Sequence, residues 1–129
     1  ELEDDEKALS DIDLKPSDGM VAEARKGLEW RREFNRGGTD VGVARARDIV
    51  SGKNMSIDTV KRMFSFFSRH EVDKEAEGFR PGEEGYPSPG RIAWALWGGD
   101  AGFSWSRKRR DQIEREESKS EVVRLTNNG

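Results

Sequence analysis

The sequence of 129 residues has no cysteine, only one histidine and no long apolar run. Without cysteine, the chain cannot form disulfides or use a thiolate as a nucleophile. A membrane-spanning helix needs about 20 consecutive apolar residues, and no segment approaches this length. The first six residues are nearly all acidic and lack the basic and apolar regions of a signal peptide. We therefore expect neither a disulfide-stabilised fold nor a membrane partner.

The single histidine, His70, has carboxylates nearby at Glu71 and Asp73. A structural metal site requires three or four ligands at defined spacing, which this segment does not supply. A nucleophile triad requires an oriented histidine beside a reactive serine, and no serine here has that setting. A histidine in the last turn of a helix is instead stabilised by the helix dipole. We therefore expect a structural role for His70, with no catalytic residue, no metal site, no cofactor and no enzyme activity.

The composition predicts one domain with a modest core. Hydrophobic residues make up 33% of the sequence and charged residues 38%. Most of the large apolar residues fall between residues 20 and 113, and both ends of the chain are polar. We expect an acidic N-terminal arm over residues 1–15, a helical domain over residues 16–117 and a polar C-terminal tail over residues 118–129.

The predicted fold class is all-α: a compact bundle of four or five short helices with a long loop rich in proline and glycine and with extended termini. Apolar residues recur at helical spacing, and each run follows a residue that can cap a helix. The expected caps are Ser17 or Asp18, Thr39 or Asp40, Ser56, Ser88 before Pro89, and Asp100. Gly37, Gly52 and Gly98 are expected to end helices. Within the tail, residues 121–126 predict a short strand or a docking segment.

Residues 71–90 form the expected loop, which contains only two aromatic residues, Phe79 and Tyr86. A loop of this length in a compact domain is usually functional or laid over the core. Glycine and proline punctuate it throughout, so no regular element is expected within it.

Aromatic residues are concentrated in the 12-residue stretch from 94 to 105, which holds Trp94, Trp97, Phe103 and Trp105. Such residues at helical spacing usually belong to the core, and an interface is the alternative. The glycines within this stretch lack the Lys-Ser/Thr pair of a phosphate-binding loop. They predict the end of one helix and the start of the next.

Charge is unevenly distributed along the chain, whose net charge is −3. Residues 1–18 hold eight acids and two lysines, whereas residues 25–47 hold seven bases and three acids. A second basic cluster occupies residues 107–110. An acidic arm beside basic helices predicts self-contact or a partner selected by charge.

Nucleic-acid binding is the alternative function that the basic helices suggest. Residues 44–67 resemble a helix-turn-helix, but the turn from Ile49 to Ser56 is longer than that motif allows. Asp58, at the start of the second helix, would also repel phosphates. The candidate nucleic-acid contacts are Arg31, Arg45, Arg47, Lys61 and Arg62.

Four segments carry a resemblance to a known family: RGGTDVGVARARD over residues 36–48, TVKRM over 59–63, FSRHEVDK over 67–74 and GRIAWALWGGD over 90–100. Together they resemble a small domain that recurs in proteins of tailed bacteriophages. In that family the domain is found alone or joined to head-morphogenesis proteins, including maturation proteases of the capsid. The resemblance covers residues 15–107 and implies a phage origin and a role in head assembly. A protease activity is not implied, because no Ser-His arrangement of that kind is present.

The leading functional prediction is therefore a non-enzymatic phage structural or head-assembly protein that acts by protein–protein binding. Its partners would be phage head or other virion proteins, with self-association and nucleic acid left open. Its place of action would be the virion or the cytoplasm of the bacterial host. The acidic arm and the tail would dock onto neighbouring subunits. The candidate interface residues are Leu9, Ile12, Leu14, Tyr86, Val122 and Leu125.

Overall fold

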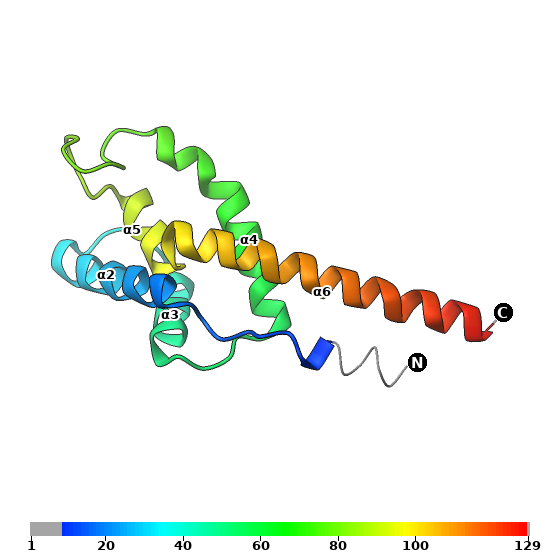
Figure 1. Ribbon diagram of the computed structural model, residues 1–129. Helices are drawn as coiled ribbons and strands as arrows, with labels where there is room; N and C mark the ends of the chain where they lie inside the picture. The colour runs from blue at the N-terminus through cyan, green and yellow to red at the C-terminus, as the bar shows by residue number, and fades with distance from the viewer. Residues whose placement is uncertain (1–8, 129) are drawn as a thin grey trace.

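A computed structural model describes the backbone of residues 9–128 and the side chains of residues 9–119. Over this range the chain is helical and contains no strand, which confirms the all-α prediction (Figure 1). The elements are α2 (Asp18–Phe34), α3 (Asp40–Ser51), α4 (Ile57–His70), the 3-10 helix η1 (Glu71–Glu75), α5 (Pro89–Leu96) and α6 (Gly99–Asn128). Among residues 9–128, no helix combines the length and the apolar character needed to cross a bilayer.

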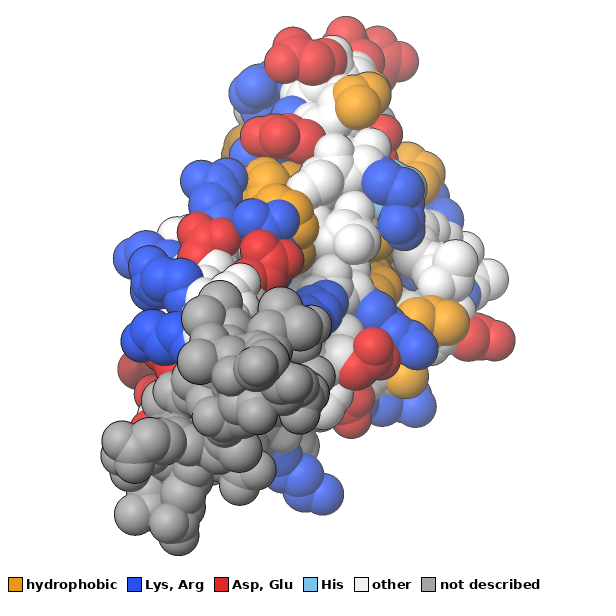
Figure 2. Space-filling model, turned by 90° about the vertical axis from the view of Figure 1, so that its right-hand side faces the viewer, with side chains coloured by type: hydrophobic (Ala, Val, Ile, Leu, Met, Phe, Trp, Pro, Cys, Tyr) orange, Lys and Arg blue, Asp and Glu red, His pale blue; other side chains and the backbone are white. Residues whose placement is uncertain are grey.

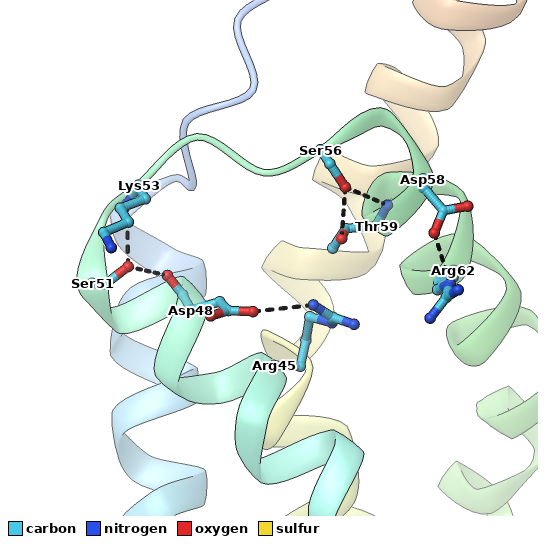
Figure 3. Close-up of polar contacts among 8 residues, drawn as sticks. All are labelled: Arg45, Asp48, Ser51, Lys53, Ser56, Asp58, Thr59 and Arg62. Atoms are coloured by element: carbon cyan, nitrogen blue, oxygen red, sulfur yellow. Dashed lines mark hydrogen bonds and ion pairs between the residues drawn. The ribbon is translucent and has the colours of Figure 1, made fainter.

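Four helices begin at caps that the sequence predicted. In each, a side-chain hydroxyl accepts a hydrogen bond from the backbone N–H three residues later, at 3.0–3.3 Å. These caps are Ser17, Thr39, Ser56 (Figure 3) and Ser88. α3 ends at Ser51 with Gly52 as its C-cap, as expected, and α2 ends at Phe34, close to the predicted end near residue 35. Its C-cap is Asn35 in the left-handed conformation (φ 49°), just before the two glycines that were expected to stop the helix. Asparagine tolerates this conformation, so the helix stops before the glycines are reached.

α2 and α5 approach each other closely where they cross. The buried residues of α2 are Met20, Ala24 and Gly27, which follow one another at the spacing of a single helical face. A Cβ atom on Gly27 would lie 2.7 Å from the backbone nitrogen of Leu96 in α5. The absence of a side chain at Gly27 therefore lets the two backbones touch.

An aromatic cluster joins α4, α5 and α6. The Phe67 ring stacks on Phe103 with a centroid distance of 5.2 Å, and Trp94 meets both rings edge-on at 4.8 and 5.8 Å. Trp105 is also buried, and its indole N–H donates a hydrogen bond to the carbonyl oxygen of Lys15. The predicted core role of the aromatic stretch is confirmed.

The stretch of residues 71–90 is not irregular throughout, as was predicted, because η1 occupies Glu71–Glu75. The remaining loop between η1 and α5 lies over the core, which is one of the two roles expected for it. Phe79 is buried against Trp94, and the backbone N–H of Ser88 donates to the carbonyl of Gly78, which closes the loop. Glu83 organises the turn between them. Its carboxylate accepts hydrogen bonds from the backbone N–H groups of Arg80 and Gly78, and these bonds lower the pKa of Glu83.

The carboxylate of Asp100 links η1 to α5. Asp100 is not the N-cap of the last helix, the role that the sequence predicted for it. α6 already begins at Gly99, whose positive φ of 65° makes the sharp turn out of α5. The Asp100 carboxylate instead accepts a hydrogen bond from the Trp94 indole at 2.9 Å and pairs with Lys74 at 2.8 Å. Burial opposes ionisation of Asp100, but the hydrogen bonds from Lys74 and Trp94 outweigh it, so the pKa of this carboxyl lies below its ordinary value.

The prediction for the C-terminal tail was wrong. A helix ending near residue 117, followed by a short strand or a docking segment over residues 121–126, was expected, but α6 continues as one helix to Asn128, which excludes the strand. The two adjacent valines in this segment favour a strand, whereas the absence of proline and glycine before Gly129 leaves nothing to stop the helix. At 1.5 Å per residue α6 is about 45 Å long, and its C-terminal part extends beyond the other helices (Figure 1).

The crossing of α2 and α5 leads to a stability prediction. Gly27→Ala should destabilise the fold by about 1–3 kcal/mol despite the better helix propensity of alanine, because a backbone atom blocks the new methyl group. Chemical denaturation measures this loss. Arg25→Ala, an exposed change on the same helix, is the control and should alter stability by less than about 0.5 kcal/mol. An unchanged Gly27→Ala protein would show that the helices are not in backbone contact.

The Asp100 pair leads to a pH prediction. Asp100→Asn removes the charge but keeps an oxygen acceptor for Trp94. Because the pKa of Asp100 is lowered by folding, its charge stabilises the chain at neutral pH, and this contribution is lost as the pH falls below 3.8 and through the lowered pKa. The side chain is 76% exposed, so the variant should be less stable by only about 0.2–1 kcal/mol at neutral pH. Denaturant unfolding at neutral and strongly acidic pH should show this gap closing in acid; a constant gap would contradict the assignment.

Candidate binding groove

A groove of about 710 Å³ runs between α4, the start of α3 and the end of α5. α4 contributes basic and polar side chains, and α3 and α5 contribute small and apolar ones. The residues from α4 are Lys61, Arg62, Ser65, Phe66, Arg69 and His70, and those from the other two walls are Gly38, Thr39, Val41, Ala93 and Trp97. Asp73 of η1 adds one carboxylate to the lining. Val41 is 56% exposed, and among the large hydrophobic side chains that the structure describes only Val72 is more exposed.

The helical period of α4 explains why the groove has this chemistry. Phe64 and Phe67 lie on one face of the helix and contact Phe103 of α6. Arg62 and Arg69 are seven residues apart, close to two full turns, and therefore share the opposite face. One face of α4 is thus apolar and packed, and the other is basic and open to the groove.

The floor of the groove is a series of stacked planar groups. Phe66 and Trp97 are nearly parallel, with a centroid distance of 4.5 Å and an interplanar angle of 10°. The His70 ring lies 4.5 Å from Phe66, and the Arg45 guanidinium lies 5.4 Å from Trp97. Phe66 and Trp97 are only 7% and 8% exposed. The ring faces are consequently used inside the protein, and little aromatic surface remains for a ligand.

Most of the cations near the groove have carboxylate partners. Arg62 pairs with Asp58 at 2.9 Å, and Lys61 pairs with Glu117 of α6 at 3.1 Å. Figure 3 shows Arg45 and Arg62 on neighbouring helices, each joined to a carboxylate of its own helix. Arg69 differs, because it is exposed and makes no ion pair with any side chain that the structure describes. Arg69 therefore supplies the unneutralised positive charge of the groove.

The five candidate nucleic-acid contacts do not share one surface. Lys61 and Arg62 line the groove, whereas Arg31 and Arg47 line a second hollow of about 530 Å³ between α2 and α3. Arg45 lies between the two, with a side chain that is only 12% exposed. On the face drawn in Figure 2, lysine and arginine side chains are interspersed with acidic and hydrophobic ones. The basic helices therefore present two separate surfaces of mixed charge.

The candidate interface residues that the structure describes pack against other parts of the same chain. Leu9, Ile12 and Leu14 are half-buried against the core. The backbone beside them is held by hydrogen bonds from the Arg109 side chain and from the backbone N–H of Met55. Tyr86 packs edge-on against Trp30 at 5.6 Å. Val122 and Leu125 lie on the helical backbone of α6, and their side chains are outside the described part of the chain, as are residues 1–8 altogether.

Arg69, Ser65 and Val41 are groove residues that the sequence-based prediction missed. A signal for the first two was present, since residues 62, 65 and 69 recur at helical spacing opposite the apolar stripe of α4. Val41 gave no signal, because a valine in the first turn of a helix is normally assigned to the core.

His70 ends α4, as predicted, and its Nδ1 lies 3.2 Å from the carboxylate of Asp73. The contact is a local one across the turn into η1, and it positions the imidazole against Phe66. Among the side chains of residues 9–119, no group of three or more potential ligands is placed to hold a metal ion.

No protein-family model, curated protein or solved structure matches this chain. The relationship to phage proteins therefore rests on the four sequence segments alone and stays a prediction.

Proposed function

We propose that this chain is a non-enzymatic structural or head-assembly protein of a tailed bacteriophage and that it acts by binding another protein. The observation that carries the proposal is the groove beside α4. Its partner would be a head protein or another virion protein, met in the virion or in the host cytoplasm. The phage context comes from the sequence resemblance, and the mode of action comes from the groove.

The chemistry of the groove favours a protein partner. Apolar surface from Val41 and Ala93 lies beside the exposed guanidinium of Arg69. Protein interfaces combine apolar contact with arginine in this way, because the guanidinium group forms directed hydrogen bonds while its stem packs against hydrophobic groups. A peptide with an acidic residue next to an apolar one would match both features.

Nucleic-acid binding is the second candidate, and exposed arginines are the observation in its favour. Arg69 in the groove and Arg47 in the α2–α3 hollow make no ion pair within the described residues. Three observations weigh against it. Three of the candidate cations, Arg45, Lys61 and Arg62, pair with carboxylates, the net charge is −3, and the aromatic faces on which bases would stack are already occupied.

Affinity capture from cells infected with a phage that encodes this chain tests the proposal. Tagged wild-type chain should retain identified head or virion proteins. Arg69→Glu should retain much less of them, because the charge that faces the partner is reversed. Arg47→Glu makes the same charge change on α3 outside the groove and should bind like the wild type. Equal recovery by all three proteins would exclude the groove, and recovery of no virion protein would contradict the proposed function.

The nucleic-acid alternative makes a different prediction for the same purified chain. Binding to a DNA duplex would weaken by a factor on the order of 1,000 between about 50 and about 200 mM salt, because several phosphate contacts release counterions. Fluorescence anisotropy over this salt range decides between the two functions. We expect no such steep response.

A further inference from the structure

We infer that the groove beside α4 receives the acidic N-terminal arm, residues 1–8, of a second copy of this chain. The inference rests on the proposed function and names one protein partner, its binding segment and its site. It would make the chain self-assemble through an exchange of arms between copies.

The charges of the two surfaces are complementary. Residues 1–8 contain five acids and one lysine, with Leu2 among the acids. The groove carries Lys61, Arg62 and Arg69 along about 12 Å of α4, from the 1.5 Å rise per residue. Six extended residues span about 20 Å, which is enough to pass all three cations. Lys61 and Arg62 already pair with Glu117 and Asp58, and Asp73 adds a carboxylate to the lining, so the attraction of the groove for an acidic segment is centred on Arg69.

The apolar part of the groove gives the arm a second point of recognition. Val41 is exposed beside Ala93 and the edges of the buried Phe66 and Trp97 rings. Leu2 is the apolar residue of the arm, flanked by Glu1 and Glu3. Burial of a leucine at this position would remove exposed apolar surface on both partners, which favours association. A purely electrostatic contact would leave Val41 in water.

The position of the described part of the arm favours a second copy over the same chain. Residues 9–15 run beside α6 (Figure 1), where the Arg109 side chain donates a hydrogen bond to the carbonyl of Asp13. α6 covers the face of α4 that carries Phe64 and Phe67, and the groove lies on the opposite face. The described part of the arm therefore lies beside α6, on the side of α4 away from the groove, and the arm that we propose for the groove is that of a second copy.

Arg69 is the contact on which this recognition depends most. Lys61 and Arg62 already have carboxylate partners in Glu117 and Asp58. Arg69 has none among the described side chains, so an incoming carboxylate displaces no existing ion pair. Reversal of the charge at Arg69 therefore removes attraction and adds repulsion without breaking a contact of the fold.

Sedimentation equilibrium of the full chain at low salt tests the inference. The wild type should associate with increasing concentration. Arg69→Glu and, separately, the arm variant Asp4→Lys with Asp5→Lys should each weaken association about tenfold or more. Combining the three substitutions in one chain should restore association, because the charges are then exchanged between the two partners. Arg47→Glu, the matched change on an exposed arginine outside the groove, should leave association unchanged.

Four outcomes would overturn the inference: a monomeric wild type, association that survives Arg69→Glu, a combined variant that is not restored, or binding of a DNA oligonucleotide in place of self-association. Each is distinguishable from failure of the proposed function. A monomer that still captures virion proteins through Arg69 loses only the second-copy partner. Loss of virion-protein capture with intact self-association removes the head-assembly role and leaves the exchange of arms.

Discussion

The stack of Phe66 on Trp97 holds the walls of the groove beside α4 together. Trp97 occupies the corner where α5 ends and α6 begins, and Phe66 lies on the groove-facing side of α4. A Cβ atom on Gly42 of α3 would lie 3.3 Å from the Trp97 indole nitrogen, so the backbone of α3 passes close to this ring. The Arg45 guanidinium lies 5.4 Å from the centroid of the same ring. One pair of rings therefore positions three walls of the groove relative to one another. Without it, α4 would be held only through its opposite face.

The same stack determines what the groove can bind. Because the two rings are in contact with each other and with His70 and Arg45, they do not offer an open face to a base. What remains exposed is the aliphatic surface around Val41 and the positive charge of Arg69. Under the proposed function, this combination favours the side chains of a peptide over the regular spacing of phosphates. The functional proposal thus follows from how the core is built.

Sequence patterns predicted the local structure well because that structure depends on neighbouring residues. The caps at Thr39, Ser56 and Ser88 follow from a hydroxyl placed just before a run with helical spacing, and all three are found in the structure. The end of α6 was predicted wrongly, because its β-branched valines favour a strand while the absence of proline and glycine favours a continued helix. Local preference alone does not decide such a case.

The candidate site was harder to predict, because it depends on how helices cross. Arg31, Arg47, Lys61 and Arg62 are close in sequence and look like one basic face. The packing of α2 on α3, and of α4 beyond α3, separates them into two hollows. Gly27, which permits the close contact of α2 with α5, carries no chemical signal of its own in a single sequence. The position of Arg69 beside Val41 likewise follows from the tertiary structure alone.

Hydrogen–deuterium exchange of the chain in complex with its protein partner tests the central claim most directly. The claim is that the open face of α4 and the start of α3 form the contact surface. The account predicts slower exchange over residues 61–70 and 38–42 in the complex, with unchanged exchange over residues 28–35 of α2, which face the other hollow. Protection confined to the α2–α3 hollow, with the groove segments unaffected, would contradict it.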